Sequence, residues 1–404
     1  MKQRGLYILL VLGLLLASCA APATPTQAPA TVVPATEAPA TEAPATEVAA
    51  TEPPQPACEQ AIKVAIIGAQ SGTNAVLGDW MKKGVTLAVE GKNAAGGIHG
   101  CPIELIIYDD EADPTKSVGL AQKVATQDNV MAAWATTNSS SALADIPIFQ
   151  QYKIPQLTNG TNITITQQGS PFIFRVNPAG PAYEDPLVDF LVEEGKTKFA
   201  IIGDNSAYGK GEALYQTDAL KRHNMEPLAY EEYGIDDKDF TGQLTKIMQT
   251  EPEVLLLAAS EVAGGLVAKQ ARQLGFEGII AGGSAMGTPK FVETAAEAAE
   301  GVYFTSPYPG NDANDTTRAF AAAYKARWGE DPEVHGANTY DGMQMLMLAM
   351  ENADPLTPEN VAAEMHKICG YQGLQGEFCY DETGEGIKVT FLGIIKGGKL
   401  TFLP

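Results

Sequence analysis

The stretch IKVAIIG (Ile62–Gly68) is a short apolar run that ends in a glycine, a pattern typical of a strand buried on both faces. After it, residues 80–92 repeat apolar side chains at helical spacing, with Met81, Val85 and Val89 on one face. The two patterns then alternate, with strands predicted at residues 103–108, 130–134 and 155–157 and helices at residues 115–127 and 141–152. Such an alternation indicates a parallel sheet covered by helices.

A second series of strands and helices begins near residue 199. Its strands are predicted at residues 199–203, 226–233, 254–258 and 278–281, and its helices at residues 210–223, 240–249 and 264–274. Segments rich in Pro and Gly, Val176–Pro181 and Ser306–Gly310, bound this series, and helices at 316–328 and 337–352 follow it. The chain from Cys58 onward is longer than the about 250–300 residues that one core spans. We therefore expect two similar α/β halves, the second inserted into the first.

The N-terminal residues predict export and a lipid anchor. Lys2 and Arg4 precede an apolar run, Leu6–Ala17, which is shorter than the about 20 residues that a membrane span needs. This is the pattern of a signal peptide, here residues 1–18. The run ends in Leu16–Cys19 (LASC), which resembles the bacterial lipobox, so Cys19 is expected to become the lipidated N-terminus. A free cysteine within a discarded signal peptide is the alternative.

Residues 19–57 are predicted to form an unfolded stalk. From Ala20 to Pro56 the sequence holds mainly Ala, Thr, Pro and Glu, with the repeat ATEAP at residues 35–39 and 40–44. Such a segment cannot bury enough apolar surface to fold, and its prolines favour an extended chain. Whether its threonines are O-glycosylated stays open.

The net charge of −22 argues against a nucleic-acid partner and against docking on anionic lipid, because both need a basic surface. A solvated acidic surface is the simplest interpretation. The four cysteines after Cys19 allow three pairings, and in an exported domain they indicate disulfides. We predict the two local pairs Cys58–Cys101 and Cys369–Cys379. A zinc site is the alternative, but no CxxC or paired-histidine spacing supports it.

Polar loops follow the predicted strands, where ligands bind in open parallel sheets. In the first half they contain Ser71, Ser139, Ser140, Gly160, Thr161 and Asn162, which we predict to bind the ligand. Hydroxyls and free N–H groups at helix starts favour an anionic group such as a carboxylate. The alternative is that a serine of residues 139–141 only caps its helix.

The second half adds three further candidates for ligand binding. Tyr208, in the loop after the strand at 199–203, is placed to close over a ligand, and Glu261 to meet a ligand ammonium. Gly283 follows the strand at 278–281. The alternatives are packing for Tyr208 and an exposed carboxylate at a helix start for Glu261.

Several motifs together resemble the leucine/isoleucine/valine-binding-protein family of ABC transporters. They are Ser71-Gly72, Gly78, Leu87–Glu90, Asn93–Ile98, Gly100, Asp109-Asp110, Asp113-Pro114, Asn138-Ser139, Tyr208–Gly211, Lys269–Arg272, Gly275 and Tyr340-Asp341. The resemblance covers nearly all of Ile62–Leu403. It implies the type I periplasmic-binding fold, in which two doubly wound Rossmann-like lobes are joined by three hinge crossings. The first lobe would hold residues 58–178 and 310–386, and the second residues 179–309 and 387–404.

The resemblance also implies roles for single residues. Ser139 matches the family's carboxylate-binding serine, Gly160, Thr161 and Asn162 match positions that donate to the same carboxylate, and Tyr208 matches an aromatic lid. Glu261 lies near the family's ammonium-binding acid, but its spacing to Lys269–Arg272 is longer than in the family. Because the family also binds amides, urea and aromatic acids, the ligand is left open between an amino acid and such compounds.

The function expected from this resemblance is solute binding for an ABC importer. The protein would be a monomer held by its lipid anchor on the outer face of the cytoplasmic membrane, with the permease and ATPase subunits as partners. A receptor domain for a signalling partner is the alternative. An enzyme is not expected, because the four histidines are isolated and neither a Gly-x-Ser-x-Gly nor a Gly-x-Gly-x-x-Gly motif is present. We expect no catalytic residues, metal or cofactor.

Overall fold

The computed structural model describes residue 58, residues 60–387 and residues 389–403. The predicted signal peptide, the lipidated Cys19 and the predicted stalk lie outside these residues. Among the helices of the described part, none is long and apolar enough to cross a membrane.

The first lobe is built on a parallel sheet with the strand order β2-β1-β3-β4-β5. Its strands are β1 (Ile62–Gly68), β2 (Ile103–Asp109), β3 (Ala132–Ala135), β4 (Gln156–Thr158) and β5 (Ile173–Arg175). Because successive side chains of a strand point to opposite faces, Val64 and Ile66 enter one core and Ala65 and Ile67 another.

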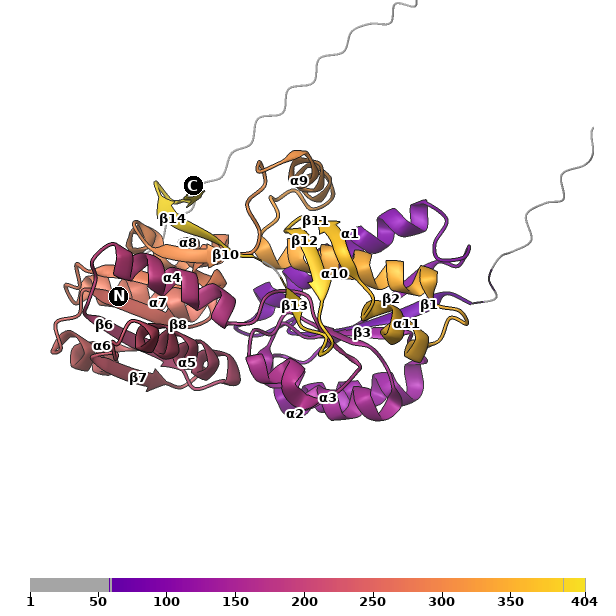
Figure 1. Ribbon diagram of the computed structural model, residues 1–404, viewed down its shortest axis with the longest axis horizontal. Coiled ribbons are helices and arrows are strands. Elements are labelled where there is room, and N and C mark those ends of the chain that lie inside the picture. Colours follow the sequence, from indigo (N-terminus) through magenta and orange to yellow (C-terminus); the bar gives the residue numbers. More distant parts are fainter. Residues whose placement is uncertain (1–57, 59, 388, 404) are drawn as a thin grey trace, which may run out of the picture. The chain divides into compact units, whose positions relative to one another are not determined.

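Helices cover both faces of this sheet (Figure 1). On the Val64 face lie α1 (Ala75–Ala94), α10 (Val334–Asn352) and α11 (Pro358–Met365). On the opposite face lie α2 (Pro114–Lys123), which continues as the short π-helix η1 (Val124–Asp128), and α3 (Ser139–Tyr152). Helix α9 (Asp315–Trp328) packs through Phe320 and Tyr324 against the start of α10.

The second lobe has a seven-stranded sheet with the order β15-β14-β10-β9-β8-β6-β7. Its parallel strands are β6 (Phe199–Asp204), β7 (Ala229–Tyr233), β8 (Val254–Ala258), β9 (Ile279–Gly282) and β10 (Tyr303–Ser306). Two antiparallel strands, β14 (Phe391–Lys396) and β15 (Lys399–Phe402), extend the sheet beyond β10.

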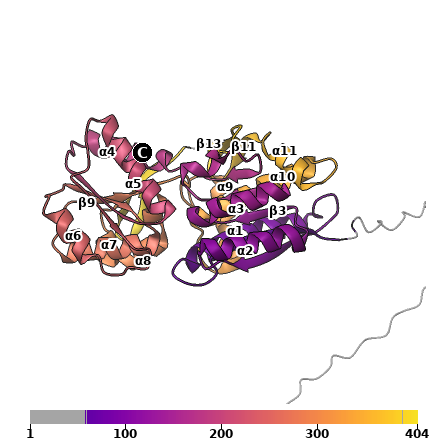
Figure 2. The ribbon, with the colours of Figure 1, turned by 90° about the horizontal axis from the view of Figure 1, so that it is seen from below.

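Helices again cover both faces of the second sheet (Figure 2). Helices α4 (Pro181–Glu193) and α5 (Ala207–Arg222) pack on one face, where Leu256 of β8 points. Helices α6 (Thr241–Met248), α7 (Glu261–Gln273) and α8 (Pro289–Ala295) pack on the other, with Leu255 and Leu257. Three short 3₁₀ helices complete the set: η2 (Ile163–Gln168) in the first lobe, and η3 (Ser284–Gly287) and η4 (Ala296–Ala299) in the second.

A small third sheet, not predicted from the sequence, consists of β11 (Cys369–Gly373), β12 (Gly376–Tyr380) and β13 (Gly386–Ile387). The Cys369–Cys379 disulfide joins its first two strands. The second disulfide, Cys58–Cys101, ties the start of the described chain to the residues before β2. Both predicted pairs are thus present in the structure.

The chain passes between the two large sheets three times: after β5, after β10 and between β13 and β14. This confirms the predicted α/β fold of two doubly wound lobes joined by three crossings. Some strands begin or end at other residues than predicted, for local chemical reasons. The strand predicted from residue 226 begins at Ala229, since Pro227 has no N–H to donate to a ladder.

Candidate ligand-binding site

A cavity lies where the carboxyl ends of strands from both large sheets meet. The first lobe lines it from the loops after β1, β3 and β4, and the second from the loops after β6, β8 and β9. About 60 Å³ is open to the centres of water molecules, several times what one water needs. The predicted residues Ser139, Thr161, Tyr208 and Glu261 all line this cavity.

Ser139 and Ser140 begin α3 but do not cap it. The cap is Asn138, whose side-chain oxygen accepts the N–H groups of Ser140 at 2.9 Å and Ser141 at 3.1 Å. Ser139 is therefore left to line the cavity, and its Oγ accepts the Asn162 N–H at 3.4 Å. Ser140 Oγ accepts the N–H of Ala207 from the second lobe at 3.2 Å.

The segment from Gly160 to Asn162 makes contacts within the protein at the groups predicted to meet a ligand. The Gly160 N–H donates to Thr158 Oγ1 at 3.0 Å, and the Thr161 hydroxyl donates to Glu212 Oε1 of α5 at 2.5 Å. The Asn162 side chain donates to the Ala207 carbonyl at 2.7 Å. Two of these three contacts reach the second lobe, so the segment bridges the lobes as well as bordering the cavity.

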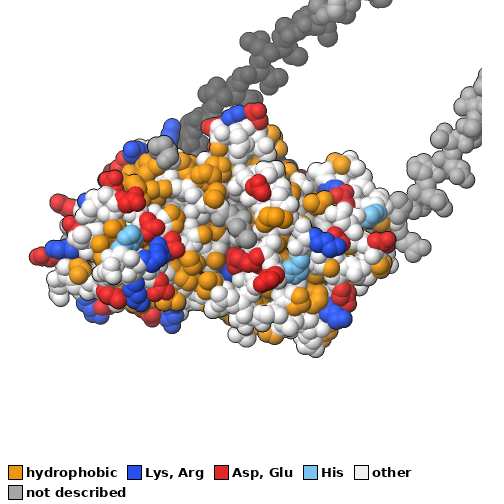
Figure 3. Space-filling view, viewed as in Figure 1, with side chains coloured by type: hydrophobic (Ala, Val, Ile, Leu, Met, Phe, Trp, Pro, Cys, Tyr) orange, Lys and Arg blue, Asp and Glu red, His pale blue; other side chains and the backbone are white. Residues whose placement is uncertain are grey.

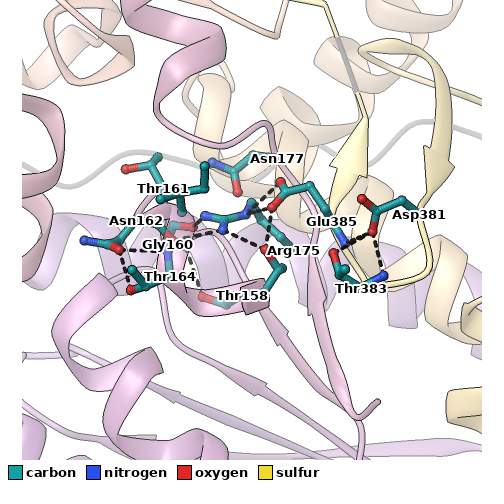
Figure 4. Close-up of polar contacts among 12 residues, drawn as sticks. Thr158, Gly160, Thr161, Asn162, Thr164, Arg175, Asn177, Asp381, Thr383 and Glu385 are labelled. Carbon is teal, nitrogen blue, oxygen red and sulfur yellow. Dashed lines mark hydrogen bonds and ion pairs between the residues drawn. The ribbon is translucent and has the colours of Figure 1, made fainter. Parts of the chain in front are cut away.

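Arg175, at the end of β5, holds this segment in place (Figure 4). Its guanidinium is fully buried and donates to the carbonyls of Gly160 and Asn162 and to the carboxylate of Glu385. The sequence did not reveal this role, because Arg175 stands in an apolar run, FIFRV, that predicts only a buried segment.

Tyr208 reaches the cavity from the first turn of α5, where Ser206 caps the helix by accepting the Gly209 N–H at 3.1 Å. Burial raises the pKa of Tyr208 well above its usual value, and the carboxylates of Glu212 and Glu261 add to the shift. Its hydroxyl therefore stays neutral and can donate. Asp204, which also lines the cavity, has its pKa raised by burial, while its hydrogen bond from Ser206 opposes the shift.

Glu261 is the first residue of α7, and its side chain is only 5% exposed. The alternative of an exposed helix-start carboxylate is therefore not what the structure shows. Burial raises the pKa of Glu261, opposed by His335, whose Nε2 lies 3.7 Å from Oε1 of Glu261. Burial also disfavours protonation of His335, but its Nδ1 lies 2.8 Å from Glu333, and the two carboxylates raise its pKa overall.

Five predicted residues do not line the cavity: Ser140, Gly160 and Asn162, whose contacts are given above, and Ser71 and Gly283. Ser71 is exposed, and its hydroxyl donates to Asp109 at 2.6 Å. Gly283 sits beside a buried pair of carboxyl groups: a Cβ there would lie 2.8 Å from Glu184 Oε1 and 3.5 Å from Glu212 Oε2. Burial raises the pKa of both glutamates, and the charge of Glu212 adds to the shift at Glu184.

Three asparagines that the sequence did not single out also line the cavity: Asn159, Asn177 and Asn338. Asn159 lies in a polar loop that the sequence indicated, one residue before Gly160. Asn177 lies in the Pro- and Gly-rich crossing. Asn338 is one turn from His335 in α10, a helix that the sequence predicted without any site.

The fold and the cleft define a class, the two-lobed solute-binding proteins. A family model described as periplasmic binding protein matches residues 61–399, and the chain belongs to that family. A leucine-, isoleucine-, valine-, threonine- and alanine-binding protein of Pseudomonas aeruginosa is 27% identical over 330 residues, which are 80% of this chain and 87% of that one. A leucine-specific-binding protein of Salmonella typhimurium is 28% identical over 333 residues, 82% of this chain and 89% of that one.

A solved structure supports the same assignment. A leucine-binding protein of Thermotoga maritima superimposes with a TM-score of 0.79 at 27% identity, covering 85% of this chain and 98% of that one. The resemblance to the leucine/isoleucine/valine-binding proteins is confirmed by these matches.

Proposed function

We propose that this protein is the extracytoplasmic solute-binding component of an ABC importer and binds a small amino-acid-like molecule between its lobes. The observation that carries the proposal is the cavity itself, which places Ser139 of the first lobe and Glu261 of the second in one lining. The Ser139 hydroxyl suits a ligand carboxylate, and the buried Glu261 suits a ligand ammonium. The relatives named as amino-acid-binding proteins support this class of ligand.

Binding would close the lobes about the crossings, as in hinge-type binding proteins. Direct contacts between the lobes already border the cavity, namely Thr161 with Glu212 and Ser140 with Ala207. Tyr208, on the second lobe, then covers the ligand that the first lobe holds. The predicted anchor at Cys19 would keep the binding lobes near the permease, with residues 19–57 as the tether.

Calorimetry on refolded protein, freed of any co-purified small molecule, tests the proposal. The protein is titrated with the common amino acids, acetamide, urea and benzoate. The bound compound is then released and identified by mass spectrometry. We expect one-to-one binding of a compound that is released unchanged. A chemically altered compound would indicate an enzyme instead.

The matched variants are Ser139→Ala and Thr126→Ala. Loss of one hydrogen bond to a charged group costs about 1.5–3 kcal/mol, so Ser139→Ala should weaken binding about 10- to 150-fold. Thr126→Ala removes an exposed hydroxyl that bonds Gln122 within α2 and η1, and should change nothing. Unchanged affinity in Ser139→Ala would place the site elsewhere.

A further inference from the structure

Three asparagine side chains line the cavity with amide oxygens that have no hydrogen-bond partner within the described residues. These residues, Asn159, Asn177 and Asn338, are at most 4% exposed. The amide nitrogen of Asn177 donates to Tyr183 Oη at 3.2 Å, which leaves its oxygen as the free atom. At Asn159 neither amide atom has a partner. Buried polar atoms without partners are rare, because each one costs folding free energy. These amide atoms are therefore candidates for hydrogen bonds to a ligand.

Helix α10 determines where Asn338 lies relative to Asn177 and Glu261. A Cβ on Gly342, about one turn after Asn338, would lie 2.7 Å from Cγ1 of Val176, the residue before Asn177. On the other side of Asn338 in the same helix, His335 faces Glu261 at 3.7 Å. Asn338 therefore lies between Asn177 and the carboxylate that suits a ligand ammonium.

The charges around the cavity also favour a ligand with N–H groups. Within the described residues no Lys or Arg lines it, and its titratable lining includes Asp204 and Glu261, with His335 beside Glu261. An adjoining hollow, which shares Asn74, Ile235 and Ser260 with the cavity, has four carboxylates and one ammonium in its lining: Glu111, Asp113, Asp236, Asp237 and Lys238. The electrostatic field of such an acidic lining attracts positively polarised groups.

Little apolar surface is offered to an aliphatic side chain. Apart from the rings of Tyr183 and Tyr208, the apolar side chains in the lining are Leu77, Ile235 and Ala285. An isobutyl or isopropyl group in this space would leave the asparagine oxygens unpaired. A site built to pair with N–H groups discriminates against an analogue that lacks them.

We propose that the ligand carries, besides its carboxylate and ammonium, a second nitrogen group with N–H donors, and that Asn177 and Asn338 accept hydrogen bonds from it. Amides, ureas, guanidines and side-chain ammonium groups share this chemistry. The inference rests on the proposed function, and it separates this chain from its leucine-binding relatives. Asn338 is a specificity-determining residue in this arrangement.

A panel of matched amino acids tests the inference on the full chain. Asparagine and leucine have side chains of similar shape but differ in having an amide or two methyl groups, and glutamine, citrulline, arginine and lysine extend the polar set. We expect the tightest ligand to belong to the polar set and to bind at least about tenfold more tightly than leucine or valine. This comparison uses the unmodified protein and needs no variant to fold.

Variants of Asn338 then locate the contact. Asn338→Leu should weaken the polar ligand at least about tenfold, while Gln344→Leu, on the same helix but outside the cavity, should not. Asn338→Asp distinguishes the sources of the N–H groups: it should tighten a cationic side chain but not a neutral amide. If Asn338→Leu fails to fold, Asn338→Ala serves in its place.

The two proposals fail in different ways. Tighter binding of leucine or valine than of every polar compound, or unchanged affinity in the Asn338 variants, overturns this inference and leaves the proposed function standing. If no amino acid or derivative of either set binds, the proposed function fails and this inference fails with it.

Discussion

The hydroxyl of Thr161 in the first lobe donates a hydrogen bond of 2.5 Å to Oε1 of Glu212 in the second. Both residues are buried, and Thr161 also lines the cavity. The carboxyl that receives this bond has Glu184 as a neighbour across Gly283. The contact between the lobes is thus made by a carboxyl group whose pKa is raised by burial and which lies near a second buried acid.

Thr161→Val should weaken ligand binding if closure forms this contact. Valine keeps the shape of threonine but removes the donor, so the closed state loses a hydrogen bond worth about 1.5–3 kcal/mol if its acceptor is charged. We expect a loss of affinity of about tenfold or more in calorimetry. Thr245→Val, which removes an exposed hydroxyl bonded to the Thr241 carbonyl within α6, is the control and should have no effect.

Glu184→Gln should make the protein more stable at pH 8. Burial holds the pKa of Glu184 above that of a free glutamate, so the folded state keeps a proton that the unfolded chain has lost. Stability therefore falls as the pH rises above about 4.5, the unfolded value, toward the raised folded value. Glutamine needs no proton, and we expect a gain of about 1–3 kcal/mol at pH 8. Urea unfolding at pH 5 and 8 measures it, and an equal effect of the exposed Glu277→Gln would contradict it.

Asp145→Asn should make the stability of the first lobe depend less on pH. Burial raises the pKa of Asp145 to about 8, the Ser117 hydroxyl opposes the shift, and the nearby Asp110 adds to it. The stability from its protonated form is complete below the unfolded value near 3.8 and is lost as the pH rises to about 8. The variant should lose less stability than the unmodified protein between pH 4 and 8 in thermal unfolding. Asp218→Asn, at an exposed site, should leave the slope unchanged.

Glu261→Gln should discriminate between ligands by their charge. If a ligand ammonium meets this carboxylate, the substitution should weaken that ligand at least about tenfold. A ligand without an ammonium should bind as before. Titration of both kinds of compound decides this, with the exposed Glu226→Gln as the control. Equal, small effects on both would mean that Glu261 serves only to pair with His335.

Cys19→Ala should release the protein from membranes. The substitution removes the sulfur to which the predicted lipid is attached, so the variant should appear in the soluble fraction and take up no labelled palmitate. Membrane association that persists together with palmitate labelling would contradict the lipobox interpretation.

The large sheets were predictable because their central strands, such as β3, β6 and β8, are apolar runs that are buried throughout. All residues of β8 are buried, and the sequence VLLLA shows it. Strands β11 and β12 are Gly-rich and partly exposed, with no such run, and only their cysteines indicated that they lie together. Their pairing depends on segments distant in the sequence, which local patterns do not contain.

The sequence predicted those site residues whose place in the fold is enough to bring them to the cavity. Ser139 and Tyr208 line the cavity because loops at the carboxyl ends of strands converge there. The state of each polar group was not predictable. The Gly160 N–H was expected to be free, but the Thr158 hydroxyl, two residues earlier, accepts it. Asn338 lies within helix α10, and the sequence pattern of this helix does not indicate that Asn338 lines a cavity shared with the other lobe.

The two strands β14 and β15 bear on how the protein is made. They complete the sheet beyond β10, yet α9, α10, α11 and the third sheet lie between β10 and β14 in the chain. During synthesis from the N-terminus, the edge of β10 therefore remains without its partner β14 until residues 391–396 have been made. An open strand edge is a template for pairing with other chains. We therefore expect the second lobe to be more prone to aggregation while this edge is open, before the intervening first-lobe segment and β14 have been made.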